Sequence, residues 1–496
     1  MRYRFEPQLK LGLIPIQDVV FNISSRHEMV PILMALQHLY NNSQDTLNSI
    51  LELIENDIGR PQNPKRGCKG MSIWEILVLA SIRLGSETDY DLLANLASNH
   101  RTLRQMMMIS DWDNKSFSRS AVHENLYKIK PETIQKIDDL IIIEGHELSD
   151  DPLKRVRGDS FVMQKNIHYP TDSNVLLDGC RKVINISKKI SDFYDIPGWR
   201  KSKYLKKELK STYRNLVKVA QSKAKDRDQR LKACYTVILE KARQIISKAL
   251  NTLSILNSRI QSGEIVLIPK WQGYVSDLQY YIGGTEYIID LAYRRVFLKE
   301  TIANVDKVFS LFEPDTELIN RGKRPNPIEF GHRVFVVQDN AGFILHNEVM
   351  GIGITDEKVI TKSMKNLQDK YHGKIDAASF DKGFWKPDNL SDLSEFIKLV
   401  VLPKKGKHTD SDRERESAKA FGEIRKWHSG IESAIGALQS GNGLKVCRDK
   451  GIDGYKRYLA MAVLGRNLHV LGNKLIEKER KKRNKQKGLL NLLLAS

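Results

Sequence analysis

Three acidic residues stand in settings that suit a catalytic metal site. Asp159 lies inside an apolar run at 156–162, and Asp381 ends a second strand-like run. Glu432 lies on an amphipathic helical pattern. Carboxylates carried by two strands and a helix are what a two-metal phosphoryl-transfer site needs, with the ions about 3.5–4 Å apart. The pattern therefore predicts metal-dependent chemistry on phosphodiesters.

Other acidic residues compete for two of these positions. Asp376 begins the strand that Asp381 ends, which indicates a surface residue. Glu423 precedes Glu432 but has the less apolar helical setting. An ion pair with an arginine is the alternative explanation of Asp159, although a charge in the middle of an apolar strand favours catalysis. We therefore expect Asp159, Asp381 and Glu432 to act together.

The composition favours a polyanionic partner. The 496 residues carry a formal net charge of +20, with a pI near 9.5, and suffice for two to four domains. Neutralisation of phosphates supplies most non-specific nucleic-acid affinity, so the charge suits DNA. A solvated basic surface on an unrelated protein is the alternative.

Cysteine usage and hydropathy predict a soluble protein of the reducing cytoplasm. The chain begins without the apolar core of a signal peptide, and no run approaches the roughly 18 apolar residues of a membrane span. The scattered cysteines form no CxxC pair, which argues against structural zinc or disulfides. Three scattered histidines lack metal-ligand spacing and are expected to be structural. These residues are Cys68, Cys180, Cys234, Cys447, His332, His346 and His372.

Residues 1–150 are expected to form a helical domain. Apolar residues at three- and four-residue spacing predict a helix after Ser72, with Glu75 completing a capping box. Further helices are predicted to start near Thr88 and Ser118. Short helices joined by polar turns suit a helix-turn-helix-like DNA-binding unit, and a helical dimerisation or packing domain is the alternative.

A basic helical block follows the first predicted strand. Residues 181–260 hold 21 Lys and Arg against 6 Asp and Glu, a net charge of +15. Long basic helices lying along DNA are one interpretation, and a solvated helical arm is the other. Just before this block, Thr171 or Asp172 is expected to cap a helix, with a position near the metals as the alternative for Asp172.

The second half alternates strands and helices. A hairpin around 339–342 is followed by predicted helices and strands in the order helix, strand, helix, strand, helix. The helix with Glu432 follows the last strand, and a long helix at 455–477 precedes a basic tail. The predicted parts are 1–150, 151–180 (first part of the catalytic domain), 181–324 (insertion), 325–475 (remainder of the catalytic domain) and 476–496 (tail).

With these segments in order, the chain resembles the DDE transposases of bacterial insertion sequences. The resemblance covers about residues 67–472 and rests on an ordered set of individually weak motifs: Asn166–Asp172, Glu313–Lys323 leading to Glu329–Gly331, Asp381–Phe384 and the Glu432 helix. It implies an α/β fold: an RNase H-like mixed sheet with flanking helices, an N-terminal helical domain and a long basic helical insertion. In that fold the first and fourth strands lie side by side and parallel, so Asp159 and Asp381 become neighbours.

The family's signature around the third acid is altered. Where the resemblance leads us to expect Tyr, Arg and Lys, this chain has Arg425, His428 and Gln439. His428 and Gln439 can still hydrogen-bond phosphates, and Lys445 and Arg448 could supply the missing charge. Lys404 and Lys405 could guide a DNA backbone, or could belong to a solubilising charge run.

The resemblance also implies cofactors and partners. Asp159, Asp381 and Glu432 would hold two Mg²⁺ ions, for which Mn²⁺ can substitute, since hard cations prefer oxygen ligands. The expected partner is double-stranded DNA, both as element terminal repeats and as target, bound by a homodimer in a synaptic complex associated with the bacterial nucleoid. Hydrolysis at the element end frees a 3′-OH that attacks target DNA.

Three functions remain open from the sequence. The first is an active transposase. The second is a metal-dependent nuclease that cleaves DNA without strand transfer, which the same three acids would serve. The third is a DNA-binding relic without catalysis, which the intact acids argue against and the altered residues Arg425, His428 and Gln439 support.

Overall fold

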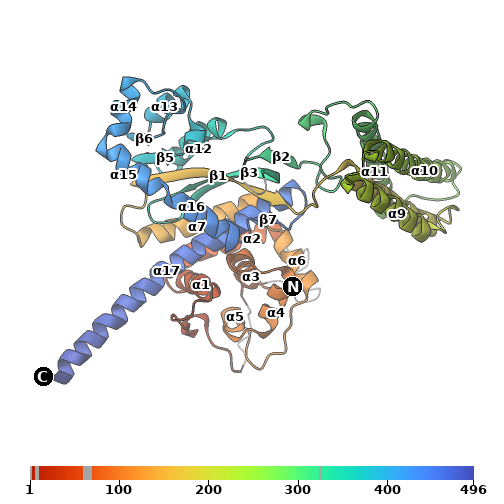
Figure 1. Cartoon of the computed structure of the whole chain (residues 1–496). Helices are drawn as coiled ribbons and strands as arrows, with labels where there is room; N and C mark the ends of the chain where they lie inside the picture. The colour runs from red at the N-terminus through yellow and green to blue at the C-terminus, as the bar shows by residue number, and fades with distance from the viewer. Residues whose placement is uncertain (1–2, 6–10, 60–69, 323–326, 496) are drawn as a thin grey trace. The chain divides into compact units, whose positions relative to one another are not determined.

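The computed structural model describes residues 3–5, 11–59, 70–322 and 327–495. It contains two compact units, which we describe separately: unit 1 is 1–166 with 331–496, and unit 2 is 167–330 (Figure 1). Cys68 and Lys323 lie outside the described residues. Among the described residues, no helix is both long and apolar enough to cross a membrane.

The N-terminal part of unit 1 is helical, as expected. The predicted capping box is confirmed: Ser72 accepts a hydrogen bond from the Glu75 backbone, and the Glu75 side chain accepts from the Ser72 backbone. Asp89 and Ser118 cap the next two predicted helices. The helices are α1 (Met29–Asn42), α2 (Gln44–Ile58), α3 (Ile73–Gly85), α4 (Tyr90–Asn99), α5 (Arg101–Met106), α6 (Arg119–Tyr127) and α7 (Pro131–Glu147).

An open mixed sheet of seven strands follows. The strand order is β2-β3-β1-β5-β6, with β4 also paired to β3 and β7 to β1. The predicted hairpin is confirmed as antiparallel β3 and β4, and β5 and β6 are parallel to β1 and to each other. The strands are β1 (Arg155–Lys165), β2 (Glu317–Asn320), β3 (Ile328–Gln338), β4 (Ile344–Val349), β5 (Ala377–Phe380), β6 (Leu399–Val401) and β7 (Val446–Cys447).

Helices connect and flank the later strands. α17 begins at Gly451 and continues to Ala495, so the segment expected as a separate basic tail after 476 extends the last helix instead. The other helices are α12 (Asp356–Lys370), α13 (Pro387–Ser394), α14 (Asp410–Ser417), α15 (Lys419–His428) and α16 (Gly430–Ser440).

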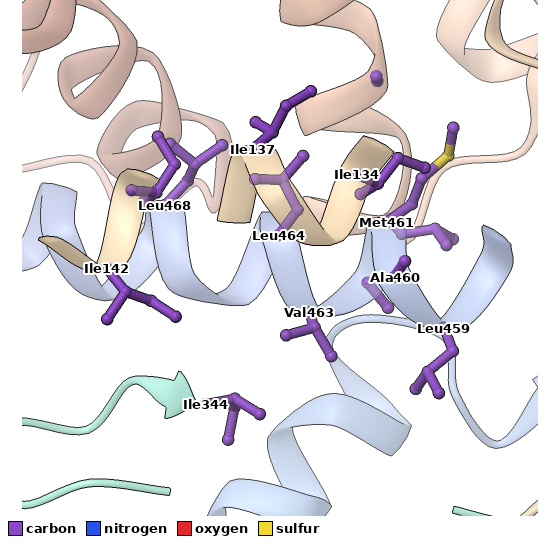
Figure 2. Packing of buried hydrophobic residues seen from close by; sticks show 14 of the residues in the cluster. Ile134, Ile137, Ile142, Ile344, Leu459, Ala460, Met461, Val463, Leu464 and Leu468 are labelled. Atoms are coloured by element: carbon purple, nitrogen blue, oxygen red, sulfur yellow. The ribbon is translucent and has the colours of Figure 1, made fainter. Parts of the chain in front are cut away.

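The N-terminal helices and the sheet share one hydrophobic core. α17 packs against α1, α3 and α7, and it also reaches β4. Figure 2 shows this junction, where Ile134 and Ile137 of α7 lie near Leu464 of α17, with Ile344 of β4 below. Residues 1–150 are therefore continuous with the sheet in one unit, whereas the sequence predicts a separate domain, because α7 and α17 each bury apolar side chains in both parts.

A buried polar contact lies inside this junction. The Asn467 side-chain amide donates to both carboxylate oxygens of Asp138 at 3.0 Å and to the Ile344 carbonyl at 3.0 Å. Its oxygen accepts from the Ile344 N–H at 2.9 Å. Asn467 on α17 thus ties α7 to β4 by hydrogen bonds that water cannot replace at a fully buried position.

Unit 2 is a four-helix assembly with its own core. Thr171 caps its first helix in a capping box with Asn174, and Asp172 forms an ion pair with Arg295. Unit 2 therefore begins at 167, earlier than the 181 expected for the helical insertion, because the first helix shares a core with the other three. The helices are α8 (Asp172–Tyr194), α9 (Ser202–Gln221), α10 (Arg227–Gln261) and α11 (Pro269–Val296).

Gly465 marks the closest approach of α17 to α3. A Cβ at Gly465 would lie 2.6 Å from both the Cα and the N of Gly85, which are backbone atoms that cannot rotate away. We expect Gly465→Ala to cost about 1–3 kcal/mol of unfolding free energy. Gly436→Ala on α16 is the control, because nothing lies within 4 Å and alanine favours helix. Denaturant unfolding measures both, and a Gly465→Ala variant as stable as the parent would contradict the contact.

Asp138 should make stability depend on pH. Burial raises its pKa to about 8 from an ordinary 3.8, so the folded chain keeps a proton that the unfolded chain releases between these values. This contribution to stability is complete below about pH 4 and is lost as the pH rises through about 8. Asp138→Asn keeps an acceptor for Asn467 and cannot ionise. The unfolding midpoint, measured at pH 5, 7 and 9, should therefore fall less with rising pH in the variant than in the parent chain. Equal falls in the two would show that Asp138 is not the origin of the pH dependence.

Candidate active site

The register between β1 and β5 brings two of the predicted acids together. The parallel pairs run from Arg155 opposite Ala377 to Gly158 opposite Phe380. Asp159 and Asp381 are the next residues on the two chains, although about 220 residues separate them in sequence. Neighbouring strands lie about 4.8 Å apart, so the two residues lie side by side, Asp159 within β1 and Asp381 just past the end of β5.

Both aspartates belong to one face of the sheet. Arg157 and Ser379 are a register pair, and each aspartate lies two residues further along an extended backbone. Side chains two residues apart in a strand point to the same face. Arg157, Asp159, Ser379 and Asp381 therefore share a face, on which Asp159 is half-buried and Asp381 is exposed.

The opposite face is an aromatic core that leaves no room at Gly158. A Cβ there would lie 2.7 Å from the ring of Phe380 and 3.1 Å from that of Phe335. These rings and that of Phe384 contact one another and are buried. A glycine directly before Asp159 thus lets the core close against β1.

Arg157 fixes the helix junction that precedes Glu432. Its Nη1 donates to the Trp427 carbonyl at 2.6 Å, and Nε and Nη2 donate to the Gln338 side chain. The guanidinium also lies 4.4 Å from the centre of the Trp427 ring. A Cβ at Gly430 would be 2.1 Å from Nη1, so a larger residue there would push the guanidinium out of this position. The junction of α15 and α16 is therefore held on the face that carries Asp159.

Glu432 lies in the first turn of α16, where its charge suits the helix dipole. α16 packs on β1 through buried apolar residues and through Gln439, whose side-chain amide donates to the Val162 carbonyl at 3.5 Å. The Glu432 side chain is exposed. Gln439, predicted to contact DNA, contacts the backbone of β1.

His428 connects the second and third acids electrostatically. Burial lowers the pKa of its imidazole below the ordinary value, and Arg157 acts in the same direction. The carboxylates of Asp381 and Glu432 and the backbone of Ser379 act in the opposite direction. One half-buried ring is thus within electrostatic reach of both acids, and it is mostly neutral at pH 7. Among the described residues its Nδ1 has no hydrogen-bond partner.

The three acids match magnesium in chemistry but are not gathered into a finished site. Carboxylate oxygens are the ligands that Mg²⁺ prefers. Within the described ranges, however, no three Asp, Glu, His or Cys side chains lie close enough to hold a metal ion. The backbone positions bring Asp159 and Asp381 together, and joint ligation would need the exposed Glu432 side chain to turn toward them.

Asp356 supports the site from the other face, and the sequence analysis missed it. It begins α12, accepts the Ser160 hydroxyl at 2.7 Å and lies 3.8 Å from Arg333. Its other oxygen would be 3.5 Å from a Cβ at Gly383, in the turn after Asp381. Asp356 thus bonds to β1 and lies beside that turn. An acid at a helix start looks like an ordinary dipole residue, so no sequence signal distinguishes it.

The two competing acids behave as surface residues. Asp376 forms an ion pair with Lys398 at 2.6 Å, as expected for the start of a strand. Glu423 is exposed on α15.

Two of the predicted DNA-contacting cations form ion pairs within the chain, although Arg425 remains exposed. Lys404 forms an ion pair with Asp412, and together with Thr409 it holds the pKa of that carboxyl below its usual range. Arg425 lies 3.9 Å from Glu416, whose other oxygen accepts the Lys404 N–H at 2.8 Å. Lys405 is exposed. These contacts fold the charged segment 404–416 against α15.

Lys445 and Arg448 lie at the other end of β1. β7, between them, pairs with Gln164 and Lys165. Lys165 is six residues after Asp159 along β1, a distance of about 20 Å. Both cations are exposed, but they are too far from the aspartates to contact a phosphate bound there.

Comparison of the chain with models of protein families, with curated proteins and with solved structures finds no match. A function for this chain therefore has to be inferred from its residues and their geometry.

Arg157 should control the order of the α15–α16 junction. Arg157→Ala removes the hydrogen bond to the Trp427 carbonyl, and bonds from charged donors contribute about 1.5–3 kcal/mol. Amide hydrogen exchange at 427–432 should accelerate about tenfold or more. Arg155→Ala is the matched control, because Arg155 lies 4.6 Å from the same ring but bonds to Asn340 instead. Equal acceleration in both variants would argue against the role of Arg157.

Proposed function

We propose that this chain is a DDE-type DNA transposase with an RNase H-like catalytic core. It would cleave DNA at the ends of an insertion sequence and join the freed ends to target DNA. The catalytic residues in this proposal are Asp159, Asp381 and Glu432.

The single observation that carries the proposal is the parallel register of β1 and β5. It sets two carboxylates at adjacent positions on one face of a mixed sheet. The helix with the third acid packs on the same strand, and Arg157 holds its start on that face. An ion pair or a helix cap explains a single acid in such a place, but neither explains two adjacent acids beside an exposed third.

The chain's own residues would bind and orient the reactants. Magnesium, when bound, supplies an activated hydroxide and stabilises the leaving oxygen. Asp159 and Asp381 project side by side from the rigid sheet, so they fix the position of the phosphodiester, while Glu432 on a packed helix completes the set from the side. Hydrolysis would break the P–O3′ bond at the element end and free a 3′-OH. That oxygen would then attack a target phosphorus in line and displace the target strand's own 3′-oxygen, which takes up the proton. Positioning supplies most of the catalysis in this scheme.

The charge distribution supports a long DNA partner. The basic block 181–260 lies in α8, α9 and α10 of unit 2, whose apolar residues form a separate core and leave the lysines outward. Duplex DNA is bound chiefly through its phosphates. In this proposal unit 2 contacts the element ends, and the enzyme acts as a homodimer.

Asp381→Asn should abolish cleavage and joining. The substitution keeps the size of the side chain and removes its charge, and metal-assisted charge stabilisation contributes several kcal/mol, or about a thousandfold in rate. The assay follows a labelled duplex with the flanking element ends, with Mg²⁺ and then Mn²⁺. Asp376→Asn, on the same strand but ion-paired to Lys398, is the matched control and should keep activity.

The products separate the competing functions. Joined products that disappear in Asp381→Asn support the transposase. Cleavage without joining would favour a metal-dependent nuclease. No activity in the parent with either metal would favour a DNA-binding relic, and activity that survives Asp381→Asn would remove this residue from the site.

A further inference from the structure

Unit 1 contains a cleft that none of the three acids lines. It has a volume of about 520 Å³, within the range of small-ligand sites. Residues from α3, α4, α6 and the segment between β7 and α17 line it, and Arg448, at the end of β1 opposite Asp159, is one of them. Its lining also includes Arg83, Tyr90, His123, Tyr127, Asp449 and Lys450.

The floor of the cleft is a buried, charge-neutral pair. Arg83 donates to both oxygens of Asp449, at 2.5 and 3.3 Å, and lies 4.1 Å from the centre of the Tyr90 ring. Within the described part of the chain, the Arg83 Nε and the Tyr90 hydroxyl have no hydrogen-bond partner.

One wall is aromatic and open to solvent. His123 and Tyr127 lie one turn apart on α6, and their rings stack with centroids 5.3 Å apart. Tyr90 meets His123 edge-on at 4.8 Å, and Arg457 supports Tyr127 at 4.1 Å. Both stacked residues are exposed, although aromatic side chains normally bury their surface.

The rim carries the available positive charge. Arg119 is 3.4 Å from Asp91, and Asp89 caps α4, so these carboxylates are engaged. Arg448 and Lys450 are exposed and form no ion pair with any described residue. The cleft thus combines stacked rings with two free cations.

We propose that this cleft binds single-stranded DNA, with one base against the His123–Tyr127 rings and the adjoining phosphates at Arg448 and Lys450. Base stacking on aromatic rings is tolerant of sequence and is typical of single-strand sites, whereas a duplex keeps its bases stacked inside. The inference rests on the proposed function, in which DNA cleavage exposes strand ends. The cleft is about 20 Å or more from Asp159, about six nucleotides at the B-form spacing of 3.4 Å.

The test measures binding without cleavage. Fluorescence anisotropy of a labelled 12-nucleotide oligothymidylate is followed with the full chain in EDTA, with a 12-base-pair duplex and free thymidine monophosphate as competitors. Tyr127→Ala should weaken oligothymidylate binding about tenfold, since stacking contributes about 1–3 kcal/mol per base. Tyr127→Phe, which keeps the ring, should bind like the parent. Duplex binding should change less than twofold in both.

A second variant removes charge without touching the rings. Arg448→Ala with Lys450→Ala should reduce the slope of log K against log salt by about 1.4 for the single strand, about 0.7 for each phosphate contact. Lys128→Ala, an exposed cation directly after the last residue of α6 and outside the cleft lining, is the matched control and should leave the slope unchanged.

Three results would overturn the inference: unchanged single-strand binding in both variants, equal losses for single strand and duplex, or equal competition by the mononucleotide. The binding assay contains no metal, so its result does not depend on cleavage. If oligothymidylate binding depends on Tyr127 but the parent chain cleaves no DNA with Mg²⁺ or Mn²⁺, the proposed transposase is refuted and the cleft assignment stands.

Discussion

The register of β1 against β5 is the constraint on which the site depends. A slip of one residue would send Asp159 to the opposite face of the sheet, away from Asp381. Side chains on the other face prevent this slip, because Phe335 and Phe380 pack where only Gly158 leaves room. The Ser160–Asp356 hydrogen bond then fixes the next residue on that face. An apolar core thus specifies the position of a polar site that it does not touch.

Hydrogen bonds from α17 also hold β1 in place. The Tyr455 hydroxyl bonds to the Met163 carbonyl of β1 and accepts the His332 N–H of β3, and further along the helix Asn467 bonds to β4 and α7. One helix therefore connects three strands to the N-terminal helices. This explains why those helices share a core with the sheet and are not an independent domain.

Local signals predicted the elements well, and long-range contacts were less predictable. The capping box at Ser72, an N-cap at Thr171 or Asp172, the hairpin and the strand that ends at Asp381 follow from short patterns, and all are present, with Thr171 as the N-cap. The adjacency of Asp159 and Asp381 came from a family resemblance, since periodicity carries no strand order. The start of unit 2 at 167 and the extension of α17 depend on which surfaces pack, which sequence patterns do not encode. Arg157 had a signal that was overlooked: a charge two residues before Asp159 on the same face.

The altered signature around Glu432 changes which residue supplies the fixed cation of the site. The expected helix arginine is replaced by His428, whose burial keeps it mostly neutral at pH 7. Arg157 reaches the same junction from β1, so a guanidinium is retained there. Its donors, however, already bond to the Gln338 side chain and the Trp427 carbonyl. Burial also lowers the pKa of Arg157, because the charged guanidinium loses contact with water. A guanidinium engaged in this way orients a helix and leaves little for a phosphate. The charge of a bound DNA strand would then have to be met by cations that remain exposed, such as Lys382 next to Asp381.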